Sequence, residues 1–137
     1  MKNIEQIDIS GDAGLRIRGK SMEDLFENAA LGMSNLITDT NKTGETEQRE
    51  ITLNRDTNEY TLIRWLNELV FLFDTYGFIG KTFHVSFAET TLTAHVSGGY
   101  FDPERDDKKL LIKAATYHNL SLRKVNSLWE ATVIFDI

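Results

Sequence analysis

Two acidic residues near opposite ends of the chain could bind a metal ion together. Asp12 lies in the turn-forming stretch Gly11-Asp12-Ala13-Gly14, and the sequence ends on an apolar strand pattern, Phe135-Asp136-Ile137. Alternation puts Asp136 on the face opposite Phe135, and the main-chain carboxylate of Ile137 adds a second, repelling negative charge. If the Asp12 turn lies beside this strand, three carboxylates converge, and calcium, magnesium and manganese prefer such hard oxygen ligands. An aspartate between two glycines is also ordinary turn chemistry.

The stretch from Gly14 to Ser21 matches the phosphate-loop pattern, two glycines five residues apart followed by Lys and Ser. Such a loop needs its intervening residues in a tight nest of backbone N–H groups after a parallel strand. Here the residues 15–18 alternate apolar and polar, as a strand does, and Ser21 is explained as a helix N-cap. We therefore interpret the match as accidental.

The remaining reactive residue types give no metal or catalytic motif. His84, His95 and His118 fall on different predicted strands without ligand spacing such as His-x-x-x-His, so we interpret each as a sheet or surface residue. The chain has no cysteine, which excludes disulfides, zinc–thiolate sites and thiol nucleophiles. A serine–histidine–acid arrangement cannot be argued from spacing, because such triads assemble in space.

Two predicted helices have to position these residues. In the stretch from Tyr60 to Tyr76, apolar residues recur at helical spacing and cover more than one side, and Asp56 or Thr57 is the expected N-cap. The other helix begins at the N-cap Ser21 and extends to Ile37 with one apolar face. A helix buried on more than one side needs a sheet against its broad face and a second helix beside it.

Alternating apolar and polar residues predict the strands around these helices. The predicted strands cover residues 4–9, 15–18, 49–53, 83–87, 92–96, 110–116, 120–125 and 129–135. Residues 38–48 are predicted to form a mobile surface loop, and the acidic stretch 97–109 a solvated loop whose charge could also serve a cation or a partner. We predict the α+β class: a single domain over residues 1–137, with two helices packed on a mostly antiparallel, hairpin-connected sheet.

The charge and hydropathy of the chain limit its partners. A net charge of -6 and a pI near 5.0 oppose tight, direct binding of RNA or DNA, which usually needs a basic surface. The first residues lack the apolar core of a signal peptide, and no apolar run reaches the roughly 18 residues of a membrane span. We therefore expect a cytoplasmic protein without membrane contacts.

Several separated blocks of this sequence, in the right order, resemble the archease family. They are Asp12 followed by Gly14, Leu25-Phe26-Glu27-Asn28-Ala29-Ala30, Trp65-Leu66-Asn67-Glu68-Leu69, Leu72-Phe73-Asp74, Lys113-Ala114-Ala115-Thr116-Tyr117-His118 and Phe135-Asp136-Ile137. One position departs from the family. Its Asp-His-Thr-Ala-Asp motif reads Asp8-Ile9-Ser10-Gly11-Asp12 here, so Ile9 replaces the histidine and the closing aspartate is kept.

The resemblance implies a small α+β protein that is not itself an enzyme. Archeases are protein cofactors of the GTP-dependent RNA-splicing ligase of tRNA splicing, and they promote guanylylation of the ligase and its turnover. The resemblance also implies a calcium site at Asp12, Asp136 and Ile137, for which magnesium or manganese are alternatives. RNA would then be reached only through the ligase, which agrees with the acidic charge of the chain.

Three other functions are compatible with the same residues. The acids could serve a small metal-dependent phosphate-ester hydrolase, although no general base is evident with isoleucine in the histidine position. An RNA-end binding module would bind with a steep salt dependence. A chaperone-like adaptor would protect unrelated clients from aggregation.

Overall fold

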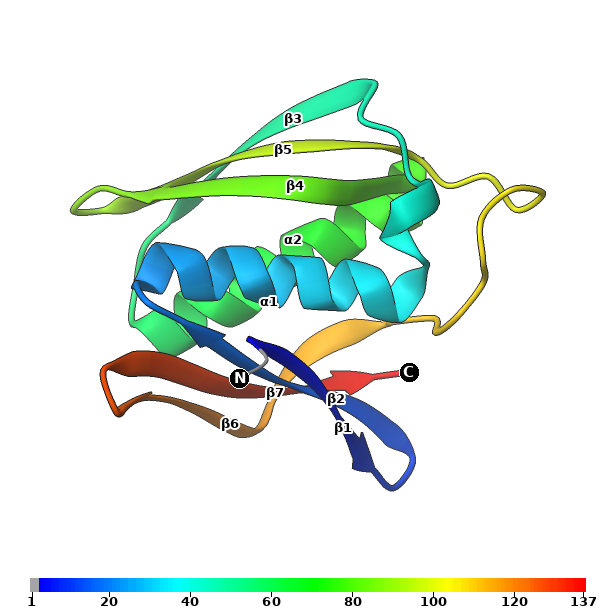
Figure 1. Cartoon of the computed structure of the whole chain (residues 1–137). Helices are drawn as coiled ribbons and strands as arrows, with labels where there is room; N and C mark the ends of the chain where they lie inside the picture. Colours follow the sequence, from blue (N-terminus) through cyan, green and yellow to red (C-terminus); the bar gives the residue numbers. More distant parts are fainter. Residues whose placement is uncertain (1–2) are drawn as a thin grey trace.

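In the computed structural model, which describes residues 3–137, both helices lie between two antiparallel sheets (Figure 1). The chain-end sheet has the strand order β1-β2-β7-β6, and the hairpin sheet has the order β3-β5-β4. The elements are β1 (Ile4–Ile9), β2 (Asp12–Gly19), α1 (Met22–Ile37), the 3-10 turn η1 (Thr40–Lys42), β3 (Glu47–Asn54), α2 (Asn58–Tyr76), β4 (Phe78–Phe87), β5 (Thr91–Tyr100), β6 (Ala114–Val125) and β7 (Leu128–Asp136). The predicted α+β class is confirmed, but the strands form two sheets rather than one.

Side-chain caps set the starts of both helices. The Ser21 hydroxyl accepts a hydrogen bond from the backbone N–H of Asp24 at 3.1 Å, so α1 begins where the sequence predicts. For α2, Thr57 rather than Asp56 is the cap, and its hydroxyl accepts from the N–H of Tyr60 at 3.2 Å. Both predicted helices are therefore confirmed to within a few residues of their ends.

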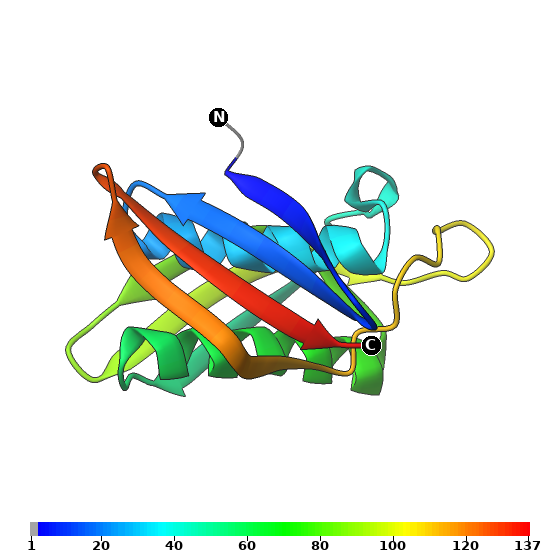
Figure 2. The same ribbon diagram turned by 90° about the horizontal axis from the view of Figure 1, so that it is seen from below.

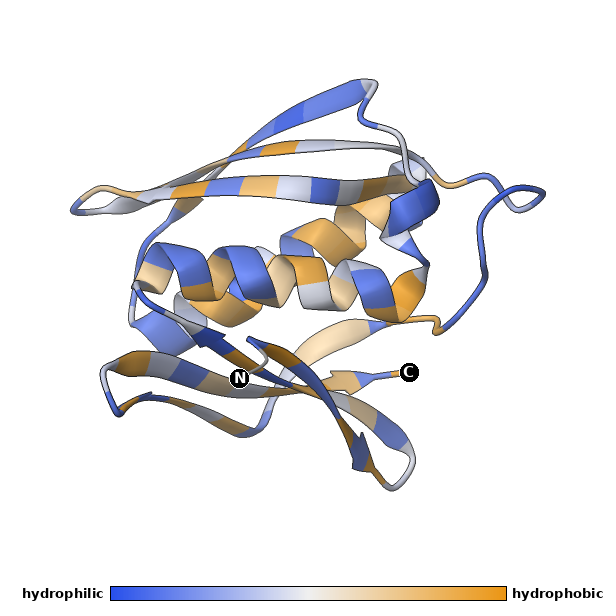
Figure 3. Ribbon diagram, viewed as in Figure 1, coloured by the Kyte–Doolittle hydropathy of each residue, from blue (hydrophilic) through white to orange (hydrophobic). Residues whose placement is uncertain are grey.

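The core lies between the helices and the inner faces of both sheets. Helix α1 contacts β2 and β4, while α2 contacts β6 and β4, so each helix buries residues against two layers. Trp65 is fully buried on α2, and its indole N–H donates to the carbonyl of Phe26 on α1 at 3.0 Å. This bond satisfies the one polar atom of the largest core side chain. Figure 3 shows hydrophobic and hydrophilic residues alternating along strands of both sheets.

The second half of the chain forms hairpins, with one difference from the predicted strands. The hairpin of β4 and β5 is confirmed, and so is the turn at Asn126 and Ser127, both at positive φ. The predicted strands 110–116 and 120–125 are in fact one strand, β6, that starts later, at Ala114. Its pairing with β7 is interrupted between Thr116 and Ser121, at the gap between the two predicted strands.

The segment predicted as a polar surface loop, residues 38–48, is packed more closely than its composition indicates. Thr38, Thr40 and Thr43 are buried, and η1 forms one tight turn within the segment. The ammonium group of Lys81 donates to the carbonyl of Thr43 at 3.0 Å, which ties the segment to β4. The prediction of an exposed loop is therefore wrong for these threonines.

Strand β4 forms one edge of the hairpin sheet, beside α1. The backbone N–H of Val85 on this edge donates to a carboxylate oxygen of Glu27, on α1, at 2.8 Å. The helix thus supplies an acceptor to a strand amide that has no neighbouring strand.

Within residues 3–137, neither helix is long and apolar enough to cross a membrane.

Candidate functional site: carboxylates at the chain ends

Asp12 and Asp136 lie at neighbouring ends of two paired strands. Strand β2 begins at Asp12, β7 ends at Asp136, and these antiparallel strands pair with Ala13 opposite Phe135. Asp12 and Asp136 are the next residues of the two strands beyond this last pair. Figure 2 shows the C-terminus next to the turn that joins β1 and β2. The start of β2 and the end of β7 therefore lie at the same end of the chain-end sheet.

The local backbone differs from the predicted four-residue turn. The turn lies at Ser10 and Gly11, where Gly11 adopts a φ of 80°, and Asp12 is already the first residue of β2. Gly14 lies within the strand, where a Cβ atom would come to 2.7 Å from Cγ1 of Ile7. The glycine is therefore needed for close packing of β1 against β2, rather than for turning the chain.

Strand alternation places both aspartates on the outer face of the chain-end sheet. Ala13 and Phe135 are buried toward the helices, so their neighbours Asp12 and Asp136 lie on the opposite face. Asp12 is half-buried and Asp136 is exposed. Ile137, whose main-chain carboxylate is the third candidate ligand, is 40% exposed. All three candidates are thus at one accessible corner of the molecule.

Within residues 3–137, neither aspartate side chain makes a hydrogen bond or an ion pair. The backbone at this corner is held by the N–H of Lys113, which donates to the carbonyl of Asp136 at 2.8 Å. In this part of the chain, no three side chains of His, Cys, Asp or Glu gather as a ready metal site. A cation here would therefore use the two aspartates together with the main-chain carboxylate of Ile137, which are all hard oxygen donors.

The residue that departs from the family motif lies directly beside this corner. Ile9 is the cross-strand partner of Asp12 in the pairing of β1 with β2. Paired residues share one face of a sheet, so an apolar side chain adjoins the carboxylate where the family has an imidazole. The position at which the sequence departs from the resemblance is therefore the cross-strand partner of Asp12.

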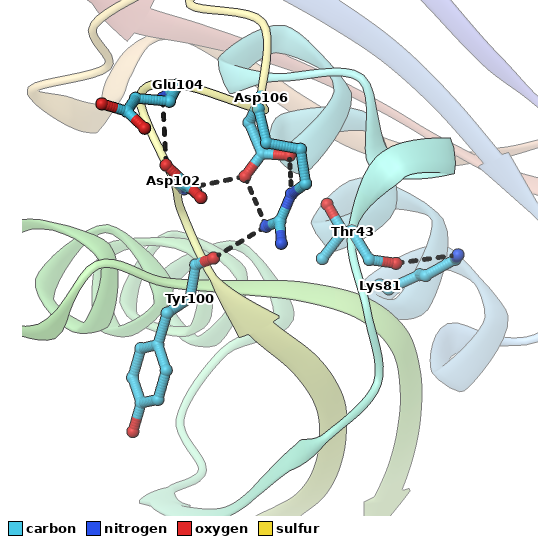
Figure 4. A network of polar contacts seen from close by, with 7 residues as sticks. Thr43, Lys81, Tyr100, Asp102, Glu104 and Asp106 are labelled. Atoms are coloured by element: carbon cyan, nitrogen blue, oxygen red, sulfur yellow. Dashed lines mark hydrogen bonds and ion pairs between the residues drawn. The ribbon is translucent and has the colours of Figure 1, made fainter.

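The acidic loop that follows β5 is built differently from the chain-end corner. The Asp106 side chain is only 1% exposed, and it accepts hydrogen bonds from Arg105 and from the backbone N–H of Asp102 at 2.8 Å (Figure 4). The bond from Arg105 lowers the pKa of the Asp106 carboxyl below its ordinary value and raises the pKa of Arg105. Arg105 also donates to the carbonyl of Tyr100 at 3.1 Å. The prediction of a solvated loop is thus wrong at Asp106.

Two further features lie away from the chain-end corner. The stretch that matches a phosphate loop runs as strand β2 up to Gly19, so its residues are extended and do not form a nest. An apolar pocket of about 260 Å³ lies where the loop after β5 passes the ends of both helices. It is lined by Ile37, Phe73, Phe101, Lys108, Lys109, Leu110 and Leu111.

Comparison with known proteins assigns the chain to a family. The Archease protein family model matches residues 5–137. The archease of Methanosarcina barkeri is 36% identical over 99% of this chain and 97% of its own length, and that of Sulfurisphaera tokodaii is 30% identical over the full length of both. Both relatives thus match almost from end to end.

Two solved structures share the fold. The solution structure of protein 1598 of Methanobacterium thermoautotrophicum covers both chains completely, with a TM-score of 0.87 and 31% identity. A Thermotoga maritima crystal structure, described as an archease and possible chaperone, has a TM-score of 0.71 and 19% identity over 97% of this chain and 96% of that one. With the family model matching nearly the whole sequence, the chain belongs to the archease family.

Proposed function

We propose that this protein is a non-catalytic activator of the RNA-splicing ligase of tRNA splicing. In this proposal it promotes guanylylation of the ligase and its turnover, and it contacts RNA only through the ligase. A divalent cation, calcium in the first place with magnesium or manganese as alternatives, is held by Asp12, Asp136 and the main-chain carboxylate of Ile137. Membership of the archease family supports the activator role.

The observation that carries the metal site is the register of β2 with β7. It sets Asp12 and Asp136 on the same outer face at one strand end, and no ion pair within residues 3–137 neutralises either side chain. Carboxylates that converge at one strand end repel each other, and a bound cation relieves that repulsion. The oxygen-only donor set fits a hard cation such as calcium.

The residues of the chain give this site its shape and its charge. The strand pairing and the bond from Lys113 hold the backbone of Asp136 in place before any ion binds. A bound divalent cation supplies charge neutralisation at the corner. Ile9, the cross-strand partner of Asp12, adds no ligand, so the oxygen donors alone determine the ion preference.

The test measures guanylylation of a cognate ligase with GTP and manganese, with and without this protein. Wild type should accelerate guanylylation, whereas the Asp12→Ala and Asp136→Ala variants should not. Glu89→Ala is the matched control, because it removes one exposed acid from the turn between β4 and β5, far along the chain from the site. Full stimulation by both aspartate variants would remove this corner from the mechanism.

Two additional measurements separate the parts of the proposal. Adding one glycine after Ile137 displaces the main-chain carboxylate, so calcium affinity measured by calorimetry should fall while the fold, measured by circular dichroism, is kept. Incubation with phosphate esters in the absence of ligase tests the hydrolase alternative. Multiple turnovers there, lost with Asp12→Ala, would replace the activator role by catalysis.

A further inference from the structure

The outer face of the hairpin sheet carries one row of ionisable side chains. Glu50 on β3 is paired with His95 on β5, and His95 is paired with His84 on β4, so the three residues lie side by side across the sheet. Their strand neighbours Ile51, Ala94 and Val85 are buried, which places the row on the face that points away from the helices. The imidazole side chains are 76% exposed at His84 and 61% exposed at His95.

Each imidazole of this row has a carboxylate at its Nδ1 atom. Nδ1 of His95 lies 3.5 Å from a carboxylate oxygen of Glu50, and Nδ1 of His84 lies 4.0 Å from one of Glu27. Within residues 3–137, no hydrogen bond or ion pair involves either Nε2 atom. Both contacts are ion-pair distances on the Nδ1 side of the rings, which leaves the Nε2 side of each ring open. Histidines that bind a metal usually have a carboxylate or carbonyl on the side of the ring away from the ion.

The adjoining rows hold no basic side chain that would repel a cation. They contain only hydroxyl and amide side chains: Gln48, Ser97 and Thr82 on one side, and Thr52, Thr93 and Ser86 on the other. Directly opposite residues of antiparallel strands have Cβ atoms about 4.5–5.5 Å apart. Two imidazoles at that separation can reach one ion with Zn–N distances of about 2.0–2.1 Å.

We propose that His84 and His95 form a site for a divalent transition-metal ion of the zinc class. The two Nε2 atoms are the protein ligands, water completes the coordination, and Glu50 and Glu27 orient the rings. Imidazole nitrogens favour zinc, copper and nickel, whereas the chain-end carboxylates favour calcium or magnesium. The inference is therefore independent of the proposed function, and the two sites are distinguished by the metal each prefers.

The experiment titrates zinc into the full chain by calorimetry, with calcium in excess to saturate the chain-end carboxylates. Wild type should bind one zinc ion per chain, and His84→Gln and His95→Gln should each lose this binding. His118→Gln is the matched control, because it removes the only other histidine of the sequence, on β6 in the opposite sheet. Circular dichroism checks the fold of all three variants, which change exposed side chains only.

A second variant tests the role assigned to the carboxylates. Glu50→Gln keeps the shape of the side chain and removes its charge, so zinc affinity should fall roughly tenfold or more without being abolished. Imidazole nitrogen chemical shifts should move on zinc addition for His84 and His95 and stay unchanged for His118. Zinc binding that survives both His84→Gln and His95→Gln, or the absence of zinc binding by wild type, would overturn the proposal.

Discussion

Two acidic regions of this molecule differ in what surrounds their carboxylates. In the loop after β5, the Asp106 carboxylate is buried and accepts hydrogen bonds from Arg105 and from the N–H of Asp102. At the chain ends, Asp12 and Asp136 have no such partner within residues 3–137, although the backbone around them is firmly paired. A carboxylate whose acceptor positions are filled by the protein holds structure together, whereas one left open at a rigid strand end is available to a ligand.

The largest expected effect concerns calcium and the chain-end corner. Calcium at 100 times its Kd should stabilise wild type by about 2.7 kcal/mol, because the ion binds the folded state only. The double variant Asp12→Asn with Asp136→Asn should gain nothing from calcium. Urea unfolding with and without the ion measures both quantities. An equal gain in the double variant would place the calcium site elsewhere.

In the loop after β5, we expect a variant of Asp106 to lose stability without any change in calcium binding. Asp106→Ala leaves the N–H of Asp102 and the Arg105 guanidinium without their acceptor, so the free energy of unfolding should fall by about 1–3 kcal/mol. The calcium affinity should stay that of wild type. The adjacent Asp107→Ala is the control, because its exposed pair with Lys42, at 3.4 Å, contributes at most about 1 kcal/mol. A change in calcium affinity for Asp106→Ala would break the distinction between the two regions.

Acid titration should show the contribution of Asp106 directly. Its pKa is lowered in the folded protein by the hydrogen bond from Arg105, while the unfolded chain has the ordinary value, about 3.9. The stabilisation is therefore fully present above the ordinary value and is lost as the pH falls through the lowered one. The difference in unfolding free energy between wild type and Asp106→Asn should stay constant from pH 7 to about pH 5 and shrink only below about pH 4. A difference that already declines near neutral pH would contradict this assignment.

The smallest expected change in unfolding free energy is that of Ile9→His, which introduces opposite Asp12 the histidine that the family resemblance implies. Ile9→His places an imidazole opposite the carboxylate, and a cross-strand pair of opposite charges contributes about 0.2–1 kcal/mol. The carboxylate raises the pKa of the new imidazole, so this gain should be present below about pH 6.5 and disappear as the pH rises. Urea unfolding of both proteins at pH 5.5 and pH 8 measures it. The same difference at both pH values would mean that the two side chains do not interact.

Local patterns in the sequence predicted the helices and a final strand that belongs to a sheet, whereas the meeting of the chain ends was a hypothesis that the family resemblance implied. Ser21 and Thr57 are strong N-caps, and the apolar ending at Phe135 indicated a final strand that belongs to a sheet. Strand alternation identifies which side chains share a face, but it does not tell which strands pair. For that reason the division into two sheets was missed, and so was the row of Glu50, His95 and His84.

The sequence also did not predict that Asp106 is buried. Asp106 lies in a stretch rich in charge with the only proline of the chain, and its composition is that of an exposed loop. Its burial depends on Arg105, the preceding residue, folding back over it, and on the chain turning so that the N–H of Asp102 faces the same carboxylate. No periodic pattern encodes such a turn, because it arises from individual hydrogen bonds.

The contact between Glu27 and the N–H of Val85 affects how copies of this protein meet. An edge strand with free amides can recruit a strand from another molecule and begin intermolecular sheet growth. Here α1 places a negatively charged acceptor on one of those amides, that of Val85 in the second half of β4, at 2.8 Å. A docking strand would have to displace a charge-assisted bond before it could pair, so the helix that fills the core also protects the hairpin sheet from aggregation along this edge.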